Sequence, residues 1–267
     1  MPELAEVEYI RKQWDAGIGQ PIRTVEVRAG KRIFRGTDVE ALVETLTGAK
    51  LLGSETRGKQ MLFRFSRGGW LGIHLGMSGH LRVEAADFAA GKHDHLVLRQ
   101  KQQALVFEDP RMFGRVRFHA GKDAPEWWTA LPPALTSEEF TVAKLRENLA
   151  RRSRSPLKAV LLDQALFPGV GNWMADEILW QARIHPATPT GTLAAKRTQA
   201  LWKNSRMVCR VALETIGRDG NDPPARWLLH VRWKPGGHCP RDGALLDRGV
   251  IAGRTTAWCP VCQPKPA

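Results

Sequence analysis

Three cysteines and an aspartate near the end of the chain have the spacing of a metal site. Cys239, Asp242, Cys259 and Cys262 follow the pattern Cys-x2-Asp-x16-Cys-x2-Cys. Two close pairs separated by the length of a hairpin are typical of a zinc finger, in which four side chains hold one structural ion. Because zinc accepts carboxylate oxygen as well as thiolate sulfur, Asp242 can take the fourth position. We therefore predict one structural zinc ion in a C-terminal β-hairpin.

Two alternatives to an Asp242 ligand remain open. His238 offers an imidazole nitrogen, although its place directly before Cys239 strains the geometry. The hairpin could also be held without metal by its apolar residues, which are Leu245, Leu246, Val250, Ile251 and Trp258. Arg248 and Arg254 lie between the two ligand pairs, so the finger is expected to contact a phosphate backbone.

A glycine-rich turn runs directly into a helical segment in the second half of the chain. Residues 167–177 read Phe-Pro-Gly-Val-Gly-Asn-Trp-Met-Ala-Asp-Glu. The backbone N–H groups of such a turn and the N-terminus of the following helix can bind an anion, and Asn172 can add a side-chain donor. The sequence therefore predicts an anion site at this turn.

The composition narrows the class of partner. The chain has 267 residues, 43% of them hydrophobic, which is enough for two domains and a small appendage. Forty Lys and Arg against 27 Asp and Glu give a formal net charge of +13, which favours a polyanion as the binding partner. We find neither a long apolar run nor a signal peptide, which argues against a membrane protein. Three of the four cysteines lie in the metal pattern, which favours a reducing cytoplasm, and we expect a monomer.

The first half of the chain is predicted to form strands. Apolar and polar residues alternate, as in residues 61–65, and glycines and Asp-Pro separate the segments. The predicted strand segments are residues 24–29, 50–66, 70–84, 94–108 and 114–119. Because no long helices separate them, an antiparallel β-sandwich is favoured over a parallel sheet. Two helices are expected to begin at Pro2 and at a capping box in residues 37–40.

The second half is predicted to be helical. Residues 131–133, Leu-Pro-Pro, mark the boundary, and residues 136–139 have the form of a second capping box. Helical periodicity covers residues 138–150, 156–166, 172–182 and 193–215, and a loop is expected over residues 217–224. Cys209 is expected in the helical core. We therefore predict an α+β protein with a β-sandwich in residues 1–132, a helical domain in 136–232 and a finger in 233–267.

The glycine-rich turn continues to Ile184-His185-Pro186, and this stretch resembles the helix–two-turn–helix of the formamidopyrimidine-DNA glycosylase and endonuclease VIII family. Five further segments resemble family motifs in the same order: residues 1–8, 57–59, 74–79, 109–114 and the finger with residues 253–256. The resemblance covers essentially the whole chain. It implies a bifunctional DNA glycosylase and abasic-site lyase of base-excision repair, which acts on damaged duplex DNA in the nucleoid of a bacterium.

The resemblance assigns the chemistry to the start of the chain. If Met1 is removed, Pro2 carries a free secondary amine that can attack the anomeric carbon of the sugar, expel the base and form an iminium. The iminium acidifies the neighbouring sugar proton, so strand cleavage by elimination follows. Glu3 is expected to act as general acid and base, with Glu6 as a supporting acceptor. From the residues alone, Pro2 and Glu3 would be ordinary members of a first helical turn.

Other residues are expected to contact DNA because they match family motifs. Lys59, Asn172 and Arg254 would converge on the phosphates that flank the damaged nucleotide, with Lys59 and Arg254 counted among the catalytic residues. The space left by the extruded nucleotide would be filled by Met77, Arg111 and Phe113. The remaining candidates for phosphate contact are His74, His93 and Lys158.

Two departures from the family pattern bear on the substrate. Met112 stands where a second arginine is common. Residues 216–232 are short for the loop that covers an extruded oxidised guanine in purine-specific members, which argues against 8-oxoguanine specificity. Ring-opened or further-oxidised purines, oxidised pyrimidines and bulkier adducts remain candidates. The alternative function is a non-catalytic protein that binds lesions or abasic sites, since it would need the same phosphate-binding residues.

Overall fold

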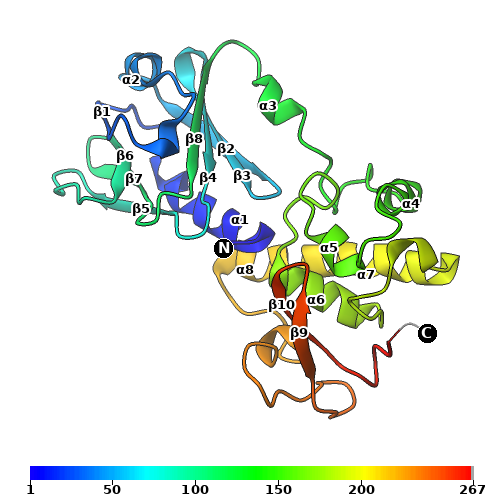
Figure 1. The fold of residues 1–267 in the computed structure, drawn as a ribbon. Coiled ribbons are helices and arrows are strands. Elements are labelled where there is room, and N and C mark those ends of the chain that lie inside the picture. The colour runs from blue at the N-terminus through cyan, green and yellow to red at the C-terminus, as the bar shows by residue number, and fades with distance from the viewer. Residues whose placement is uncertain (266–267) are drawn as a thin grey trace. The chain divides into compact units, whose positions relative to one another are not determined.

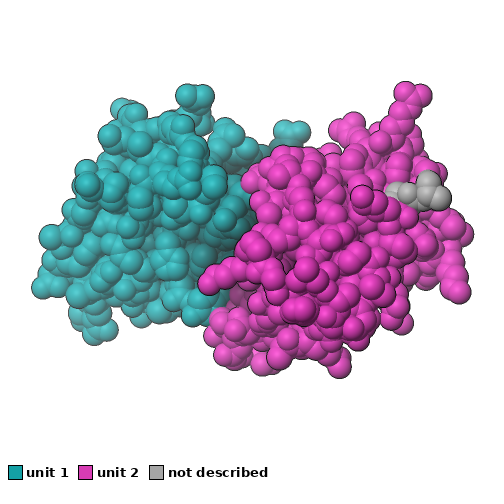
Figure 2. Space-filling view, turned by 60° about the horizontal axis from the view of Figure 1, so that its bottom comes forward, with its two compact units in different colours: residues 1–2, 6–131 teal, residues 3–5, 132–267 magenta. Residues whose placement is uncertain are grey.

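The structure, a computed structural model, describes residues 1–265 and divides into two compact units (Figure 2). The first unit comprises Met1–Pro2 and Glu6–Leu131. The second comprises Glu3–Ala5 and the chain from Pro132 onward, so the C-terminal finger belongs to the same unit as the helices. Within residues 1–265, none of the helices combines the length and the apolar character needed to cross a membrane.

The first unit contains two four-stranded antiparallel sheets (Figure 1). The first sheet has the order β2 (Leu51–Arg57), β3 (Gln60–Phe65), β4 (Gly69–His74) and β8 (Arg115–Ala120). The second has the order β1 (Thr24–Val27), β6 (Asp94–Arg99), β7 (Gln103–Glu108) and β5 (His80–Ala85). The predicted antiparallel arrangement is confirmed. The predicted segment 70–84 is divided between the two sheets, because β4 ends at His74 and β5 begins at His80.

The core of the first unit lies between inward-facing residues of both sheets. Phe63 and Leu71 come from one sheet and Leu98 and Phe107 from the other, and all four are buried. Trp14 packs against Phe63 with ring centroids 4.8 Å apart. This burial of large apolar side chains is the main force that holds the sandwich together.

The helices of the first unit are short and begin later than predicted. Its helical elements are α1 (Leu4–Lys12), η1 (Gln13–Gly17), η2 (Arg32–Phe34), α2 (Val39–Leu46), η3 (Ser66–Gly68) and α3 (Glu126–Thr129). The unit boundary passes through α1. Asp38, rather than Thr37, caps α2, because its Oδ1 accepts the N–H of Ala41 at 2.9 Å.

The second unit is helical, with a hairpin at its end. Its helical elements are α4 (Val142–Ala150), α5 (Leu157–Leu161), α6 (Asn172–Gln181), η4 (Thr190–Thr192), α7 (Ala195–Glu214), α8 (Ile216–Asp219) and η5 (Leu228–His230). The predicted capping box at residues 136–139 is wrong: Thr141 caps α4 by accepting the N–H of Lys144 at 3.1 Å. The predicted loop from residue 217 is also wrong at its start, since α8 continues to Asp219.

Helix α6 lies at the centre of this unit. Every residue from Trp173 to Trp180 is buried. Met174 and Ile178 of α6 share a core with Leu201 and Cys209 of α7. Complete burial raises the pKa of the Cys209 thiol to about 12, so this residue is an inert part of the core, as predicted.

The finger is a two-stranded hairpin, shown in red in Figure 1. It consists of β9 (Asp247–Ile251) and β10 (Arg254–Trp258), which pair antiparallel. The connecting residues Ala252 and Gly253 have φ angles of 52° and 70°, as both central positions of a type I′ turn require. Arg254 therefore leaves the turn as the first residue of β10 and is exposed.

Candidate functional site

The carboxylate of Glu3 occupies the anion site at the start of α6. Its two oxygens accept three backbone N–H groups, those of Gly171 and Trp173 at 2.9 Å and that of Met174 at 3.1 Å. The side chain is 3% exposed. Three backbone donors at the N-terminal end of the helix fix both oxygens of the carboxylate. The Glu3 side chain is thus held in one position directly after Pro2 in the sequence.

This arrangement requires glycine at position 171, because there is no space for a side chain. A Cβ at this position would lie 2.2 Å from the Glu3 carboxyl carbon. Gly169 in the same turn has a φ of 90°, a conformation that favours glycine, and its carbonyl accepts the N–H of Leu4 at 3.0 Å. The turn was predicted to bind an anion. In the structure, the three amides bind the carboxylate of the chain's own Glu3.

A buried group of charged residues joins the turn, α5, and the finger. Asp176 accepts hydrogen bonds from Lys158, Arg232 and the backbone N–H of Ala257, the last at 3.2 Å. The Nζ of Lys158 also donates to the carbonyl of Asn172 at 2.7 Å. Because all these charges are paired and hydrogen-bonded, the group is tolerated in the interior.

Lys158 was predicted as a candidate for phosphate contact, and its position requires a correction. Its side chain is 0% exposed, and burial lowers the pKa of its ammonium group. A phosphate cannot reach a fully covered side chain whose Nζ already bonds Asn172 and Asp176. Lys158 is a positioning residue for the turn.

Asn172 connects the turn to the finger through its side chain. Its Nδ2 donates to the carbonyl of Thr255 at 2.9 Å, and Thr255 is next to Arg254. This bond uses one of the two N–H groups of the amide. Ala257, three residues after Arg254, is held by Asp176. The backbone that follows Arg254 is therefore fixed relative to Asn172.

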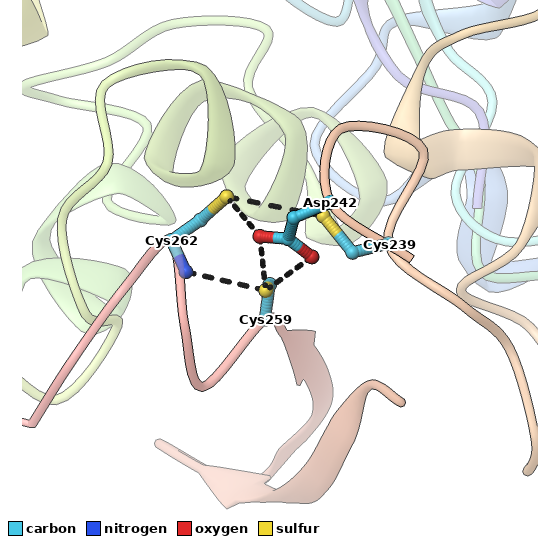
Figure 3. A group of neighbouring side chains, drawn as sticks. All are labelled: Cys239, Asp242, Cys259 and Cys262. Carbon is cyan, nitrogen blue, oxygen red and sulfur yellow. Dashed lines mark hydrogen bonds between the residues drawn. The ribbon is translucent and has the colours of Figure 1, made fainter. Parts of the chain in front are cut away.

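The predicted metal ligands lie together in the finger (Figure 3). The ligand atoms of Cys239, Asp242, Cys259 and Cys262 all lie within 4.8 Å of one another. The Sγ atoms of Cys239 and Cys262 are 3.9 Å apart, close to the roughly 3.8 Å that a tetrahedral zinc site with Zn–S bonds of about 2.3 Å requires. The residues present therefore fit a metal ion.

Two observations bear on the alternatives to an Asp242 ligand. His238 is not a member of this cluster, and its Nδ1 lies 2.9 Å from the carbonyl oxygen of Gly243. Of the apolar residues that could hold the hairpin without metal, Leu245 and Val250 are 57% and 74% exposed. Leu246 joins the three cysteines in a small core against Trp180 of α6. The exposure of Leu245 and Val250 therefore argues against a hairpin that is held by these apolar residues alone.

In the first unit, Lys59 lies in the tight turn between β2 and β3. Gly58 has a φ of 61°, which fits the first central position of a type II′ turn. Lys59 is 7% exposed. Its charge helps to lower the pKa of His74, after burial, which makes the largest contribution. The Nδ1 of His74 accepts the N–H of Gly76 at 3.0 Å, so neutral His74 presents Nε2–H as a donor.

Asp109 shapes the two loops that carry the predicted void-filling residues. Its carboxylate accepts from Ser78 Oγ at 2.6 Å, from the N–H of Arg111 at 3.2 Å and from the N–H of Gly114 at 2.7 Å. Met77 and Phe113 are 44% and 46% exposed, which is uncommon for large apolar side chains unless they contact a partner.

The side chains around Phe113 extend this exposed group. The guanidinium of Arg111 lies 4.9 Å from the centre of the Phe113 ring. Met112 has a φ of 54°, a left-handed conformation that is strained for a methionine. His93 is half-buried, and its carbonyl accepts the N–H of Asp109. The structure thus places Met77, Arg111 and Phe113 on exposed loops of one unit.

Sequence reasoning missed three residues that organise the site, namely Asp109, Asp176 and Arg232. Asp109 and Asp176 stand inside recognised motifs, but neither motif shows what their carboxylates bind. Arg232 lies 56 residues from its partner Asp176, so no local pattern joins them. A charged residue within an otherwise buried helical stretch, as Asp176 is, was the one available signal.

Comparison with known proteins identifies the two halves of the chain separately. The family model for the formamidopyrimidine-DNA glycosylase N-terminal domain matches residues 1–116. The model for the formamidopyrimidine-DNA glycosylase H2TH domain matches residues 131–221. These matches include the strand turn of Lys59 and the glycine-rich turn that holds Glu3.

Relatives and solved structures agree with these matches over the whole chain. The formamidopyrimidine-DNA glycosylase of Roseiflexus sp. (strain RS-1) is 38% identical over 274 residues, which cover 98% of this chain and all of the relative. A crystal structure of the Lactococcus lactis enzyme with FAPY-dG containing DNA has a TM-score of 0.88 at 33% identity, covering 98% of this chain and 100% of that one. A second, with an oxidized pyrimidine containing DNA, covers 99% and 100% at the same TM-score of 0.88 and 33% identity. The chain therefore belongs to the formamidopyrimidine-DNA glycosylase family.

Proposed function

We propose that this protein is a bifunctional DNA glycosylase and abasic-site lyase of base-excision repair. The observation that carries the proposal is the buried carboxylate of Glu3, fixed beside Pro2 in the sequence by three backbone N–H groups of the glycine-rich turn and α6. Its place directly after Pro2 suits a general acid and base that serves the Pro2 amine. The family membership and the solved DNA complexes of relatives support the same class of reaction.

The reaction begins at Pro2 once Met1 has been removed. The secondary amine attacks the anomeric carbon of the damaged nucleotide, the bond to the base breaks, and the base leaves with its electron pair. The attached amine loses its proton, the bond between the anomeric carbon and the ring oxygen breaks, and that oxygen takes up a proton. The amine and the sugar are then joined as an iminium, whose positive charge acidifies the adjacent sugar proton. Loss of that proton expels the 3′ phosphate and cuts the strand. Glu3 is the proton acceptor and donor nearest to Pro2 in the sequence.

We assign the phosphate and base contacts residue by residue. We assign the phosphates that flank the damaged nucleotide to Lys59, Asn172 and Arg254, with His74 and His93 as further donors. The space vacated by the extruded nucleotide is assigned to Met77, Arg111 and Phe113. The exposure of Met77, Phe113 and Arg254 supports this assignment, since contact with DNA would cover them.

The finger is proposed to hold one zinc ion through Cys239, Asp242, Cys259 and Cys262. The ion would have a structural role, because four protein ligands leave no open position for substrate. It would fix the loop that precedes β9 to the end of β10, the strand that begins with Arg254.

The proposed substrates are ring-opened purines and oxidised pyrimidines. Relatives from Lactococcus lactis have been crystallised with DNA that contains FAPY-dG or an oxidised pyrimidine. In this chain the segment after α7 contains α8, a loop and η5 between residues 216 and 230, which is short for the loop that covers an extruded 8-oxoguanine.

Borohydride trapping on duplex DNA with one abasic site tests the proposal. Reduction of the iminium should give a covalent protein–DNA adduct with the wild type, and the Pro2→Gly variant should lose it. A wild type that lacks Met1 and binds the duplex, but gives no adduct, would favour the non-catalytic lesion-binding protein.

A further inference from the structure

A hollow of about 270 Å³ lies on the outer face of the sheet β2-β3-β4-β8. The side chains that line it are basic and aromatic and include His74, Phe113, Arg115, Arg117 and Trp127. Its volume is just below the roughly 300–1,000 Å³ of typical small-ligand sites, so it suits a single small unit of a larger molecule.

Strand register explains how the basic residues of this hollow come together. Arg115 of β8 pairs with His74 of β4, and Arg117 pairs with Gly72. Because alternate residues of a strand point to the same side, Arg115 and Arg117 both face the hollow. The absence of a side chain at Gly72 makes room for Trp127, whose ring would lie 2.5 Å from a Cβ at that position. The Arg117 guanidinium lies 5.5 Å from the centre of the Trp127 ring.

Arg115 and Arg117 give the hollow a positive charge. The ion pairs among residues 1–265 do not include Arg115 or Arg117. Burial, followed by repulsion from Arg115, lowers the pKa of Arg117, and Arg117 in turn helps to lower that of His74. Like charges that repel each other without a partner are stabilised when an anion binds between them.

We propose that this hollow binds one nucleotide of a DNA strand, with its phosphodiester between Arg115 and Arg117 and its nucleoside against Trp127. Guanidinium groups bind phosphate through paired donors, and aromatic rings accept any base. His74 adds a neutral Nε2–H donor. The choice of DNA rests on the proposed function, because Phe113 and His74 belong both to this hollow and to the loops assigned to DNA.

The salt dependence of binding tests the phosphodiester contact. Affinity for a duplex with a tetrahydrofuran abasic analogue is measured from about 50 to 200 mM salt, and the Arg115→Gln/Arg117→Gln variant should reduce the slope of log K against log salt by about 0.9 for one phosphate lost. The matched control, Arg23→Gln/Arg35→Gln, removes the same charge from exposed positions of the same unit and should keep the wild-type slope. An unchanged slope in the first variant, or an equal loss in the control, would overturn the proposal.

Three further measurements keep the result separate from folding and from the proposed chemistry. The exposed Arg115→Gln variant alone should bind more weakly than wild type while it unfolds at the same temperature, and wild-type binding would count against the site. With 5-iodouracil placed next to the abasic analogue, the photocrosslink should map to Trp127. Crosslinks that map only to other residues would contradict the placement of the nucleoside against Trp127. Borohydride trapping on the same proteins tests the Pro2 chemistry independently. A wild type that gives no adduct contradicts that chemistry, and the salt dependence of binding still tests the hollow.

Discussion

Glu3 fills with its own carboxylate the place where helix-terminal amides usually bind a foreign anion. We expect Glu3→Gln to lower the rate of base excision by a factor of about 10² to 10⁴, the usual contribution of a general acid or base. The amide also puts N–H groups where backbone N–H groups already point, and an unpaired buried donor costs about 1–3 kcal/mol. Single-turnover rates and thermal unfolding measure the two effects separately. A variant with the wild-type excision rate would show that Glu3 is only a structural anchor.

Gly171 should tolerate no side chain, because an added Cβ would fall 2.2 Å from the carboxyl carbon of Glu3. We expect Gly171→Ala to displace Glu3 and to lower both stability and excision activity. Gly53→Ala is the matched control, since nothing lies within 4 Å of its Cβ position and its φ is not positive. Thermal unfolding and excision assays on both variants check this, and equal behaviour of the two would contradict the steric argument.

For single residues, the sequence predicts the kind of side chain at a site better than it predicts which groups that side chain contacts. The types at Pro2, Glu3 and Asn172 follow from the motifs that contain them. Sequence did not show that the turn's amides bind Glu3, because these residues are 168 to 171 positions apart. Lys158 was misread for the same reason: a lysine near a phosphate-binding turn is usually exposed, and its burial depends on Asp176.

At the scale of elements, α6 carries a further buried carboxylate, that of Glu177, whose ionisation should make the stability of the fold depend on pH. Glu177 accepts from Gln181 Nε2 at 2.8 Å and from the N–H of Leu229 at 3.0 Å, which ties η5 to the helix. Burial raises the pKa of Glu177 from 4.5 to about 7, and this difference corresponds to about 3 kcal/mol. The folded state therefore holds the proton more tightly than the unfolded state does.

The sign of the pH effect follows from this difference. The stabilisation is fully present below pH 4.5 and is lost as the pH rises through 7, because the folded chain must then bury a charge. We expect the free energy of unfolding of the wild type, relative to Glu177→Gln, to decrease between those pH values. Denaturant titrations at several pH values measure it, and a pH-independent difference would contradict the assignment.

The finger gives a prediction about metal content. We expect Asp242→Ala to lose zinc or to bind it more weakly, whereas Asp242→Cys should retain one equivalent, because either carboxylate or thiolate completes a tetrahedral site. His238→Ala is the control and should keep the wild-type content. Elemental analysis after dialysis against a chelator gives the stoichiometry. Zinc that is retained by Asp242→Ala and lost by His238→Ala would reverse the choice of ligand.

Element types were predicted well and element ends poorly. The strands of the sandwich alternate clearly, so their existence was readable. The start of α4 was misplaced because residues 136–139 resemble a cap, while Thr141 forms the real one. The split of residues 70–84 between two sheets depends on pairing of β5 with β7 and of β4 with β8, which no local pattern contains.

For the whole molecule, the excess of positive charge predicts steep salt dependence. Each phosphate contact adds about 0.9 to the slope of log K against log salt. We expect Arg254→Gln to lower the slope by about that amount, because its exposed side chain is assigned to a phosphate. Arg226→Gln, also exposed, is the control for net charge. Equal slopes for the two variants would contradict a specific contact.

The proposed reaction depends on one covalent bond, between the nitrogen of Pro2 and a sugar carbon. Peptide mapping by mass spectrometry of the borohydride-trapped complex locates that bond directly. We expect the sugar remnant on the N-terminal peptide, at Pro2, in protein from which Met1 has been removed. A remnant on a lysine, or full trapping by protein that retains Met1, would contradict the account.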